Sequence, residues 1–435
     1  MKIAWFTPFS RRSAIAKVSQ LVTAELARHI EVDIWHPEAP DLRETHLRRI
    51  PCTRGSSFSL LRTYDLVVYS MGDHLEFHRE VFSATQHVPG VVILHDFVMH
   101  HFFGGYYLHE LQDVPAYIAA MHRLYGPQAR RIAQDAAVGK RSWPWATDEV
   151  MEYPFFELAI EGAFGVVTHS EFLREYVEKV YSGPVKRISL AYEAGLADSG
   201  YSRKDLGVPD DNVLAVTVGH VNPNKRVHEV IEALGRDREL ARKLTYAVIG
   251  PCGGEYRDGL LAAIQRHSLE NTVLLLGYTP DDRMTSYLAN ADFCINLRYP
   301  AMEGGSASLA EEMLHGKAVL VMNAGCYREV PDDCVVKINP EREERELASA
   351  LRKLITDSGW RHEVGGRGQQ FAQANFRAER YASDFLAFLE EVKSAMPVLQ
   401  YLDRMASHLR QMGVSREMVL VDTVARESAQ LFGER

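Results

Sequence analysis

The fold is decided by residues 293–322, which read Phe293-Cys-Ile-Asn-Leu-Arg-Tyr-Pro-Ala-Met-Glu-Gly-Gly-Ser-Ala-Ser-Leu-Ala-Glu-Glu-Met-Leu-His-Gly-Lys-Ala-Val-Leu-Val-Met322. The stretch begins and ends with short apolar runs, Phe293–Leu297 and Ala318–Met322. A loop containing two glycines and a helical pattern at Ser306–His315 lie between them. Apolar runs joined through a helix predict parallel strands that are covered on both faces.

The same alternation extends in both directions along the chain. On each side of a polar segment at 191–211, short β-branched runs alternate with helical patterns. Expected strands before this segment are Lys2–Thr7, Val32–Trp35, Leu66–Tyr69, Val91–Leu94, Val166–Thr168 and Val185–Leu190, and those after it include Val213–Val218, Leu244–Ile249 and Thr272–Leu276. Expected helices include Ala14–His29, Leu108–Ala137 with a break near Gly126, Glu149–Ala163, Ser170–Tyr181, Val227–Leu234 and Pro280–Asn290.

This order predicts an α/β protein with two facing, doubly wound, Rossmann-like domains. We expect the domains to span residues 1–192 and 203–375. Residues 376–394 are expected to form a helix that crosses back to the first domain, and residues 395–435 a helical extension. Within this part we expect separate helices at Ala378–Met396, Val398–Met412 and Ser415–Phe432.

Composition excludes several classes of protein. The net charge of −9 argues against general nucleic-acid binding, which depends on neutralising phosphates. The five cysteines show no paired spacing that would indicate zinc or redox chemistry. No apolar run approaches the roughly 18–20 residues that span a bilayer, and Pro8 interrupts the start too early for a secretory signal. We therefore expect a cytoplasmic protein, with the inner face of the membrane left open as a place of action.

The glycine-containing loop is the strongest chemical signal. Gly304, Gly305 and Ser306 lie where backbone amides at a helix start could bind a diphosphate. Glu303 and Glu311 flank this turn, and carboxylates suit the vicinal hydroxyls of a sugar or ribose. A solvated loop and an exposed acidic helix face are the alternative reading of these residues.

A second loop joins an expected strand to an expected helix. It reads Gly219-His220-Val-Asn-Pro-Asn-Lys225-Arg226. Cations are unfavourable at the positive end of a helix unless an anion binds there. This arrangement predicts a phosphate contact for Lys225 and Arg226, with ordinary surface cations as the alternative.

In the first domain, His95 and Asp96 follow the strand Val91–Leu94 and should face the cleft. His95 could exchange a hydrogen bond or a proton with a substrate hydroxyl, although a structural His95–Asp96 pair remains open. Aromatic residues beside Gly104 and Gly105, including Phe102 and Tyr106, could form an acceptor platform or simply core. The first 62 residues carry 10 basic against 6 acidic side chains, a weak indication of an anionic partner.

Taken together, these motifs resemble the retaining nucleotide-sugar glycosyltransferases of family 4, which have the GT-B fold. The resemblance extends to about residue 394. It rests on Glu303-x7-Glu311 with Gly-Gly-Ser between, on Gly219-x5-Lys225, and on Leu-His95-Asp96.

The resemblance implies a role for each motif residue. Glu311 would hold the donor ribose. Glu303, with the amides of Gly304, Gly305 and Ser306, would hold the donor sugar and its diphosphate. Lys225 would neutralise the leaving diphosphate. His95 would contact the donor sugar near the reacting carbon, and His95, Asp96 and Glu303 would be the catalytic residues.

Two departures from the family pattern assign further expectations. His220 follows Gly219 where relatives carry Arg, and Arg226 would supply that charge. Arg11 and Arg12 replace paired glycines in the first loop, and we expect them, with Phe102 and Tyr106, on the acceptor side.

The expected reaction is transfer of a hexose-type sugar, with retention, from a UDP- or GDP-linked donor to a carbohydrate or lipid-linked acceptor in envelope polysaccharide or glycoconjugate synthesis. No cofactor, metal ion or nucleic acid is expected, and weak peripheral membrane contact is left open. The alternatives are a nucleotide-sugar epimerase, a glycosyl phosphorylase, and a non-catalytic protein that binds sugar nucleotides.

Overall fold

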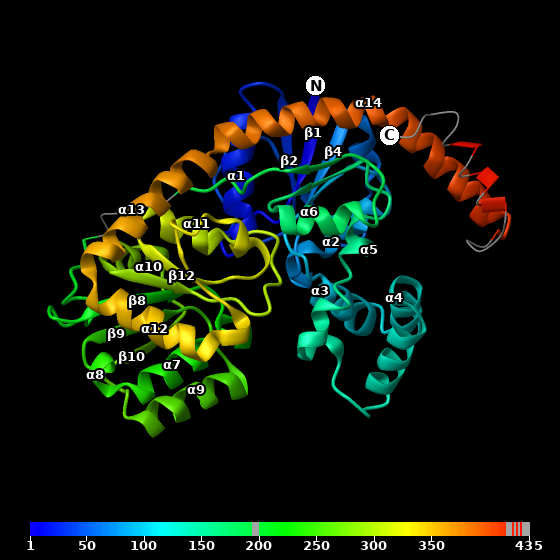
Figure 1. Cartoon of the computed structure of the whole chain (residues 1–435). Helices are drawn as coiled ribbons and strands as arrows, with labels where there is room; N and C mark the ends of the chain where they lie inside the picture. Colours follow the sequence, from blue (N-terminus) through cyan, green and yellow to red (C-terminus); the bar gives the residue numbers. More distant parts are fainter. Residues whose placement is uncertain (194–199, 415–419, 422, 425–426, 429–435) are drawn as a thin grey trace.

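The structure is a computed structural model, and it describes residues 1–435 apart from 194–199, 415–419, 422, 425–426 and 429–435. Two parallel sheets, each covered by helices, lie side by side and are joined along one edge by a long C-terminal helix (Figure 1). The expected α/β fold with two facing doubly wound units is therefore confirmed. Residues 194–199 of the polar segment at 191–211 lie outside the described residues.

The first sheet has seven strands in the order β3-β2-β1-β4-β5-β6-β7, and all neighbouring pairs are parallel. In chain order its strands are β1 (Lys2–Phe6), β2 (Glu31–Pro37), β3 (Arg49–Cys52), β4 (Leu66–Met71), β5 (Val91–Leu94), β6 (Gly165–Thr168) and β7 (Val185–Arg187). The helices of this unit are α1 (Ala14–Leu26), α2 (Leu75–Thr85), α3 (His100–Gly105), α4 (Val114–Ala137), α5 (Phe156–Ile160) and α6 (Glu171–Glu178).

The second sheet has six parallel strands in the order β10-β9-β8-β11-β12-β13. Its strands are β8 (Val213–Val218), β9 (Leu244–Ile249), β10 (Val273–Gly277), β11 (Phe293–Asn296), β12 (Ala318–Met322) and β13 (Val336–Ile338). The helices are α7 (Val227–Arg236), α8 (Arg238–Ala241), α9 (Gly254–His267), α10 (Asp281–Asn290), α11 (Ala307–Leu314), α12 (Glu343–Thr356) and α13 (Ser358–Asn375).

Both sheets contain a point at which the strand order reverses. In the first sheet this point lies between β1 and β4, and in the second it lies between β8 and β11. In open α/β sheets, ligands bind outside the carboxyl ends of the strands at such points. The loops that follow β8 and β11 begin with Gly219 and Leu297, so the topology places both second-unit motifs at this position.

Several expected elements differ from the observed ones. The continuous helix expected at Glu149–Ala163 is wrong: Pro154 interrupts it and Phe155 has φ 63°. A short 3-10 helix at Asp148–Met151 and the five-residue helix α5 form instead. A residue before proline avoids helical backbone, which explains the break. The break expected near Gly126 is confirmed, since Gly126 has φ 83° inside α4. Strands β3 and β13 were not expected.

The C-terminal helix differs from the expected pair of helices at Ala378–Met396 and Val398–Met412. The structure has one helix, α14 (Ala378–Gln411), with Pro397 inside it. Its first half packs on α1 and β1, where the Trp5 and Phe385 ring centroids are 5.4 Å apart. Tertiary packing of this apolar face holds the helix across the proline, which otherwise costs roughly 3 kcal/mol. Most of the expected helix Ser415–Phe432 lies outside the described residues.

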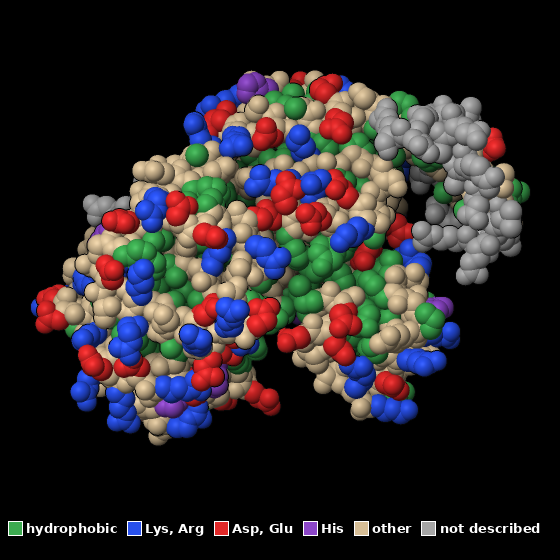
Figure 2. Space-filling model, in the orientation of Figure 1, with side chains coloured by type: hydrophobic (Ala, Val, Ile, Leu, Met, Phe, Trp, Pro, Cys, Tyr) green, Lys and Arg blue, Asp and Glu red, His purple; other side chains and the backbone are tan. Residues whose placement is uncertain are grey.

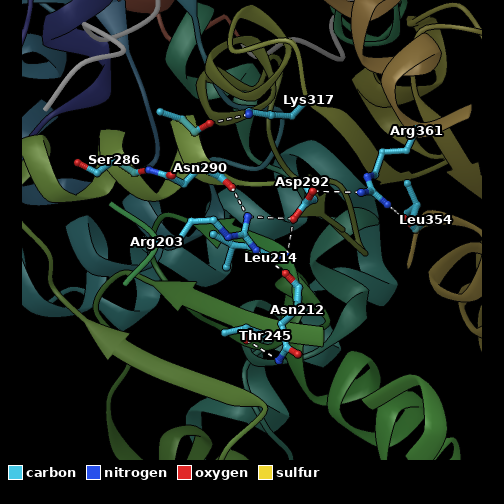
Figure 3. Close-up of polar contacts among 11 residues, drawn as sticks. Arg203, Asn212, Leu214, Thr245, Ser286, Asn290, Asp292, Lys317, Leu354 and Arg361 are labelled. Carbon is cyan, nitrogen blue, oxygen red and sulfur yellow. Dashed lines mark hydrogen bonds and ion pairs between the residues drawn. The ribbon is translucent and has the colours of Figure 1, made fainter. Parts of the chain in front are cut away.

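A polar network stabilises the second unit at the edge opposite the carboxyl ends of its strands (Figure 3). Asp292, just before β11, lies between Arg203 at 3.2 Å and Arg361 at 3.1 Å, and it accepts the Leu214 backbone amide at 2.8 Å. Arg361 is buried, and Arg203 precedes β8 in sequence. Asp292 therefore ties the chain before β8 to the start of β11 and to α13.

Among the helices of the described residues, none combines the length and apolar character that crossing a bilayer requires.

Candidate functional site

The two units meet where the loop after β11 contacts the loop after β5. Gly304 donates its backbone amide to the His95 carbonyl at 2.8 Å, and Met302 accepts the amides of Phe97 and Val98 at 2.9 and 3.0 Å. Asp96 and Glu303 form an isolated antiparallel bridge between these hydrogen bonds. The candidate residues Glu303, His95 and Asp96, which are remote in sequence, therefore lie along one seam.

The close approach at this seam depends on Gly304 and Gly305. A Cβ on Gly304 would lie 2.5 Å from Leu173 Cδ2, and one on Gly305 would lie 2.8 Å from His169 Cβ. Ser306 is the N-cap of α11, and its hydroxyl accepts the Leu309 amide at 3.2 Å. These glycines thus allow close contact between the units. The Gly304 amide, which was expected to bind phosphate, donates instead to the His95 carbonyl.

Lys225 is buried beneath the loop that begins at Gly219. Its ammonium donates to the Val218 carbonyl. Gly219 has φ 100°, and a Cβ there would lie 3.1 Å from Lys225 Nζ, so this turn needs glycine. Burial, followed by the nearby Arg298 charge, lowers the pKa of Lys225. An anionic ligand would favour the charged form.

Three further side chains lie near Lys225 and were not predicted from the sequence: Glu312, Asn296 and Arg298. Glu312 is buried, and its Oε2 accepts from Asn296 Nδ2 at 2.8 Å. Burial raises the pKa of Glu312. Within the described part of the chain, Arg298 Nη1 and Glu312 Oε1 are buried without a hydrogen-bond partner. Buried polar atoms are usually paired, so these orphans indicate a place for water or a polar ligand.

Glu303 is held in place by two residues that are not neighbours in sequence. Arg298 Nε donates to its Oε1 at 2.9 Å, and the Tyr327 hydroxyl donates to the same oxygen. Burial and the nearby Glu303 charge raise the pKa of Tyr327, which keeps this hydroxyl a donor. The carboxylate is therefore fixed by two donors.

Glu311 lies against the first unit. Its carboxylate is 3.5 Å from Lys17 Nζ, and it accepts the Tyr192 hydroxyl at 3.0 Å. The Lys17 ammonium also lies 4.1 Å from the centre of the Tyr192 ring. Glu311 is thus buried in a contact between the units.

On the first unit's side, Asp96 and Asp73 lie together at the ends of β5 and β4. Asp96 Oδ2 accepts the Asp73 amide at 2.9 Å, and Asp73 accepts from His101 Nδ1 at 2.7 Å. Burial, followed by the Asp73 and Glu303 charges, raises the pKa of Asp96 to about 7. The structural His95–Asp96 pair, which was the alternative reading, does not form through the His95 ring nitrogen that is in contact: His95 Nδ1 lies 3.1 Å from His169 Nε2.

The remaining candidates lie apart from this cluster. Arg226 pairs with Glu343 and, at 3.1 Å, with Glu229. His220 is exposed next to Gly219. Arg11 and Arg12 are exposed in the loop after β1, and Arg11 pairs with Glu44 at 3.1 Å while Arg12 lies 3.6 Å from Glu76.

The aromatic platform needs correction. Phe102 has no exposed surface and packs on Phe82 and Phe103, with ring centroids at 5.5 and 4.9 Å. Its expected contact with an acceptor is wrong, because the core already encloses the ring. Tyr106 is half-buried and stacks on Phe102. The surface is hollowed between the second unit and the α4 region, with apolar side chains above the hollow (Figure 2).

Comparison with known proteins agrees with this architecture. The sequence profile described as "Glycosyl transferases group 1" matches residues 199–371. A Campylobacter jejuni protein, N-acetylgalactosamine-N,N'-diacetylbacillosaminyl-diphospho-undecaprenol 4-alpha-N-acetylgalactosaminyltransferase, is 25% identical over 280 residues, which cover 63% of this chain and 73% of that protein.

Solved structures show the same fold. Sucrose-phosphate synthase from Thermosynechococcus elongatus has a TM-score of 0.62 and 17% identity, over 91% of this chain and 100% of that one. Anabaena HepE in complex with UDP-glucose has a TM-score of 0.61 and 19% identity, over 89% and 99% of the two chains. Residues 199–371, which form most of the second unit, therefore match the group 1 glycosyltransferases, and the chain is a transferase built from two α/β units in the GT-B arrangement.

Proposed function

We propose that the protein transfers a hexose-type sugar, with retention, from a nucleoside diphosphate donor to an acceptor hydroxyl. The observation that carries this proposal is the buried cluster of Lys225, Arg298 and Glu312, which has unpaired polar atoms and adjoins Glu303. Two cations at the reversal point of a parallel sheet suit a diphosphate. Glu303 then holds hydroxyls of the donor sugar at the seam that faces His95.

The leaving diphosphate gains negative charge as the bond to the sugar breaks. Lys225 and Arg298 stabilise this charge, because Lys225 is buried and the Arg298 side chain is only 13% exposed, so their electrostatic effect is weakly screened there. No divalent ion is assigned to this step. The positive charge comes from the protein's own side chains.

Retention fits a route in which reaction occurs on one face of the sugar. The acceptor oxygen forms a bond to the anomeric carbon on the face from which the diphosphate departs. The bond from that carbon to the phosphate oxygen breaks, and the acceptor's proton passes to the departing phosphate. This route needs no enzyme nucleophile, and it places Glu303 and His95 as groups that orient the sugar.

Donor entry requires the two units to separate. Glu311 is expected to hold the donor ribose, yet Lys17 and Tyr192 of the first unit occupy its carboxylate. We propose that the described arrangement is closed and that these contacts open to admit the nucleotide. Hinge motion of this kind is common where two domains enclose a ligand.

The proposed donor is a UDP-sugar and the proposed acceptor is lipid-linked. UDP-glucose is bound in the HepE structure, and the Campylobacter relative is named for an undecaprenol-diphosphate acceptor. The site's diphosphate chemistry also accommodates GDP. The first unit would bind the acceptor, at the cytoplasmic face of a membrane and with weak peripheral contact.

Calorimetry with UDP, GDP and ADP tests the donor assignment. Lys225→Met should weaken binding of the preferred diphosphate by about 10- to 100-fold, since losing a charged hydrogen bond costs about 1.5–3 kcal/mol. Arg226→Met is the matched control, because Arg226 pairs with Glu343, and its effect should be several-fold smaller. Equal affinity in wild type and Lys225→Met would remove Lys225 from the diphosphate site.

A further inference from the structure

His95 has one ring nitrogen in a defined contact and one without. Its Nδ1 lies 3.1 Å from Nε2 of His169, a residue at the end of β6, and the two ring centroids are 4.8 Å apart. Nε2 of His95 is buried and has no hydrogen-bond partner among the residues that the structure describes. The free nitrogen belongs to a residue of the seam between the units, next to Asp96 and Glu303.

The ring of His169 is held by a backbone carbonyl. Its Nδ1 lies 3.0 Å from the Ile188 backbone carbonyl, just after β7. A carbonyl oxygen only accepts hydrogen bonds, so Nδ1 of His169 carries the hydrogen. In a neutral imidazole the other nitrogen, Nε2, then has a lone pair and accepts.

This sequence of hydrogen bonds determines the state of His95. Because Nε2 of His169 accepts, Nδ1 of His95 must be the donor. Nε2 of His95 then keeps its lone pair. Burial lowers the pKa of both rings, to about 4 for His169, and the nearby His169 lowers the pKa of His95 further. Both rings are therefore neutral near pH 7, as this chain of donors requires.

We propose that His169 is a positioning residue that fixes the tautomer of His95, so that Nε2 of His95 accepts a hydrogen bond from a substrate hydroxyl. This inference rests on the proposed function for the identity of the substrate, a sugar nucleotide. The tautomer itself is a property of the free protein. The reverse tautomer would present an N–H at the same point and would repel a hydroxyl's hydrogen.

Two substitutions separate positioning from packing. His169→Gln places an amide oxygen near the original Nε2, so it keeps an acceptor for His95. His169→Asn places its amide near the original Nδ1, so it keeps the donor to Ile188 but removes the acceptor. Both replacements are smaller and polar, and a purely structural role would give both a similar loss of thermal stability.

The test is nitrogen NMR of the ligand-free protein with 15N-labelled histidine, with the His95 signals assigned by their loss in His95→Gln. We expect His95 in the wild type to be neutral with hydrogen on Nδ1. His169→Gln should keep this signature, and His169→Asn should shift His95 toward hydrogen on Nε2. Hydrogen on Nε2 in the wild type, or an unchanged signature in His169→Asn, would overturn the proposal.

Turnover of UDP-glucose provides the second readout. His169→Asn should lower kcat by on the order of tenfold, the value of one hydrogen bond, while UDP affinity stays unchanged. His169→Gln should stay within about threefold of wild type. If the tautomer signatures behave as expected but neither wild type nor variants turn over any nucleotide sugar, the proposed function fails and the positioning of His95 stands.

Discussion

Glu329 in the second unit accepts the backbone amide of Phe172 in the first unit at 2.7 Å. Its other carboxylate oxygen accepts the neighbouring amide of Glu171 at 2.9 Å, so one side chain caps the start of α6 across the seam. A carboxylate at this position satisfies free amides and opposes the positive end of the helix dipole. The proposed opening of the two units would break this cap.

Replacing this cap should shift the protein toward an open form. Glu329→Gln removes the charge but keeps the shape, and a charge-assisted contact of about 1.5–3 kcal/mol would change the open population about tenfold or more. Small-angle scattering should show a larger radius of gyration for the variant without ligand. Glu175→Gln, on the exposed face of the same helix, is the control. Identical scattering profiles for wild type and Glu329→Gln would show that the Glu329 cap does not hold the two units closed.

The second prediction concerns Asp96 and pH. Its pKa is raised to about 7, mainly by burial, so the folded protein keeps a proton that the unfolded chain releases near pH 4. The unfolded state therefore binds fewer protons between about pH 4 and 7, and the free energy of unfolding falls as pH rises through this window. Asp96→Asn keeps the acceptor for the Asp73 amide and removes the titration. Its stability relative to wild type should grow by about 1–3 kcal/mol from pH 5 to pH 8 in denaturant titrations.

A constant difference between Asp96→Asn and wild type at both pH values would show that this carboxyl titrates normally. Glu255→Gln, at an exposed position at the start of α9, is the control for replacing a carboxylate by an amide.

The sequence could predict those parts of the site whose residues lie close together along the chain. Glu303, Gly304 and Glu311 belong to one strand–loop–helix segment, and Lys225 follows Gly219 in another, so local pattern and topology sufficed to bring them to one edge. His169 and Glu329 gave no comparable signal. Their roles arise from contacts with His95 and Phe172, which depend on how the two units dock rather than on local spacing.

The same reasoning applies to Arg226 and Phe102. Arg226 follows Lys225 directly, and the sequence alone does not show which of the two side chains points into the site. In the structure Arg226 has φ 56° at the start of α7 and pairs with Glu343, while Lys225 turns inward. The sequence around Phe102 and Gly104 was compatible with an exposed aromatic platform and with a buried core. In the structure Phe102 packs against Phe82 and belongs to the core.

The third prediction concerns the network around Asp292. Asp292→Ala leaves two arginines without their carboxylate, one of them buried, and should lower the free energy of unfolding by about 3 kcal/mol or more. Asp332→Ala removes an exposed ion pair with Lys337 and should cost less than about 1 kcal/mol. Chemical denaturation of both variants measures the difference. UDP affinity should stay constant, since the network lies at the opposite edge of the sheet, and comparable costs for both variants would contradict this account.

The fourth prediction concerns metal ions. Sugar transfer should survive an excess of EDTA, because in the proposed mechanism Lys225 and Arg298 supply the positive charge that stabilises the leaving diphosphate. Initial rates with and without chelator should agree within about twofold, a difference under about 0.5 kcal/mol in the barrier. A rate that falls to background and returns with added Mg²⁺ or Mn²⁺ would refute the metal-free reaction.

The last prediction separates Phe102 from Tyr106. Phe102 is fully enclosed, so Phe102→Ala should lower the free energy of unfolding by about 3–5 kcal/mol and reduce every activity through loss of folded protein. Tyr106 is only half-buried and lies next to it, at a ring-centroid distance of 6.2 Å. Tyr106→Leu keeps the apolar packing and removes the ring and hydroxyl. It should cost less than about 1.5 kcal/mol of stability.

Two rates measured on Tyr106→Leu then decide whether this aromatic side chain serves the acceptor. Donor hydrolysis without acceptor should stay near wild type, because the proposed donor site lies in the second unit. Transfer to a lipid-linked acceptor should fall by about tenfold, the value of roughly 1.4 kcal/mol of contact energy. Leu111→Ala, an exposed apolar residue of the same region, is the control for general surface effects. If donor hydrolysis and transfer fall together in step with thermal stability, Tyr106 is part of the core, as Phe102 is, and the acceptor must bind elsewhere on the first unit.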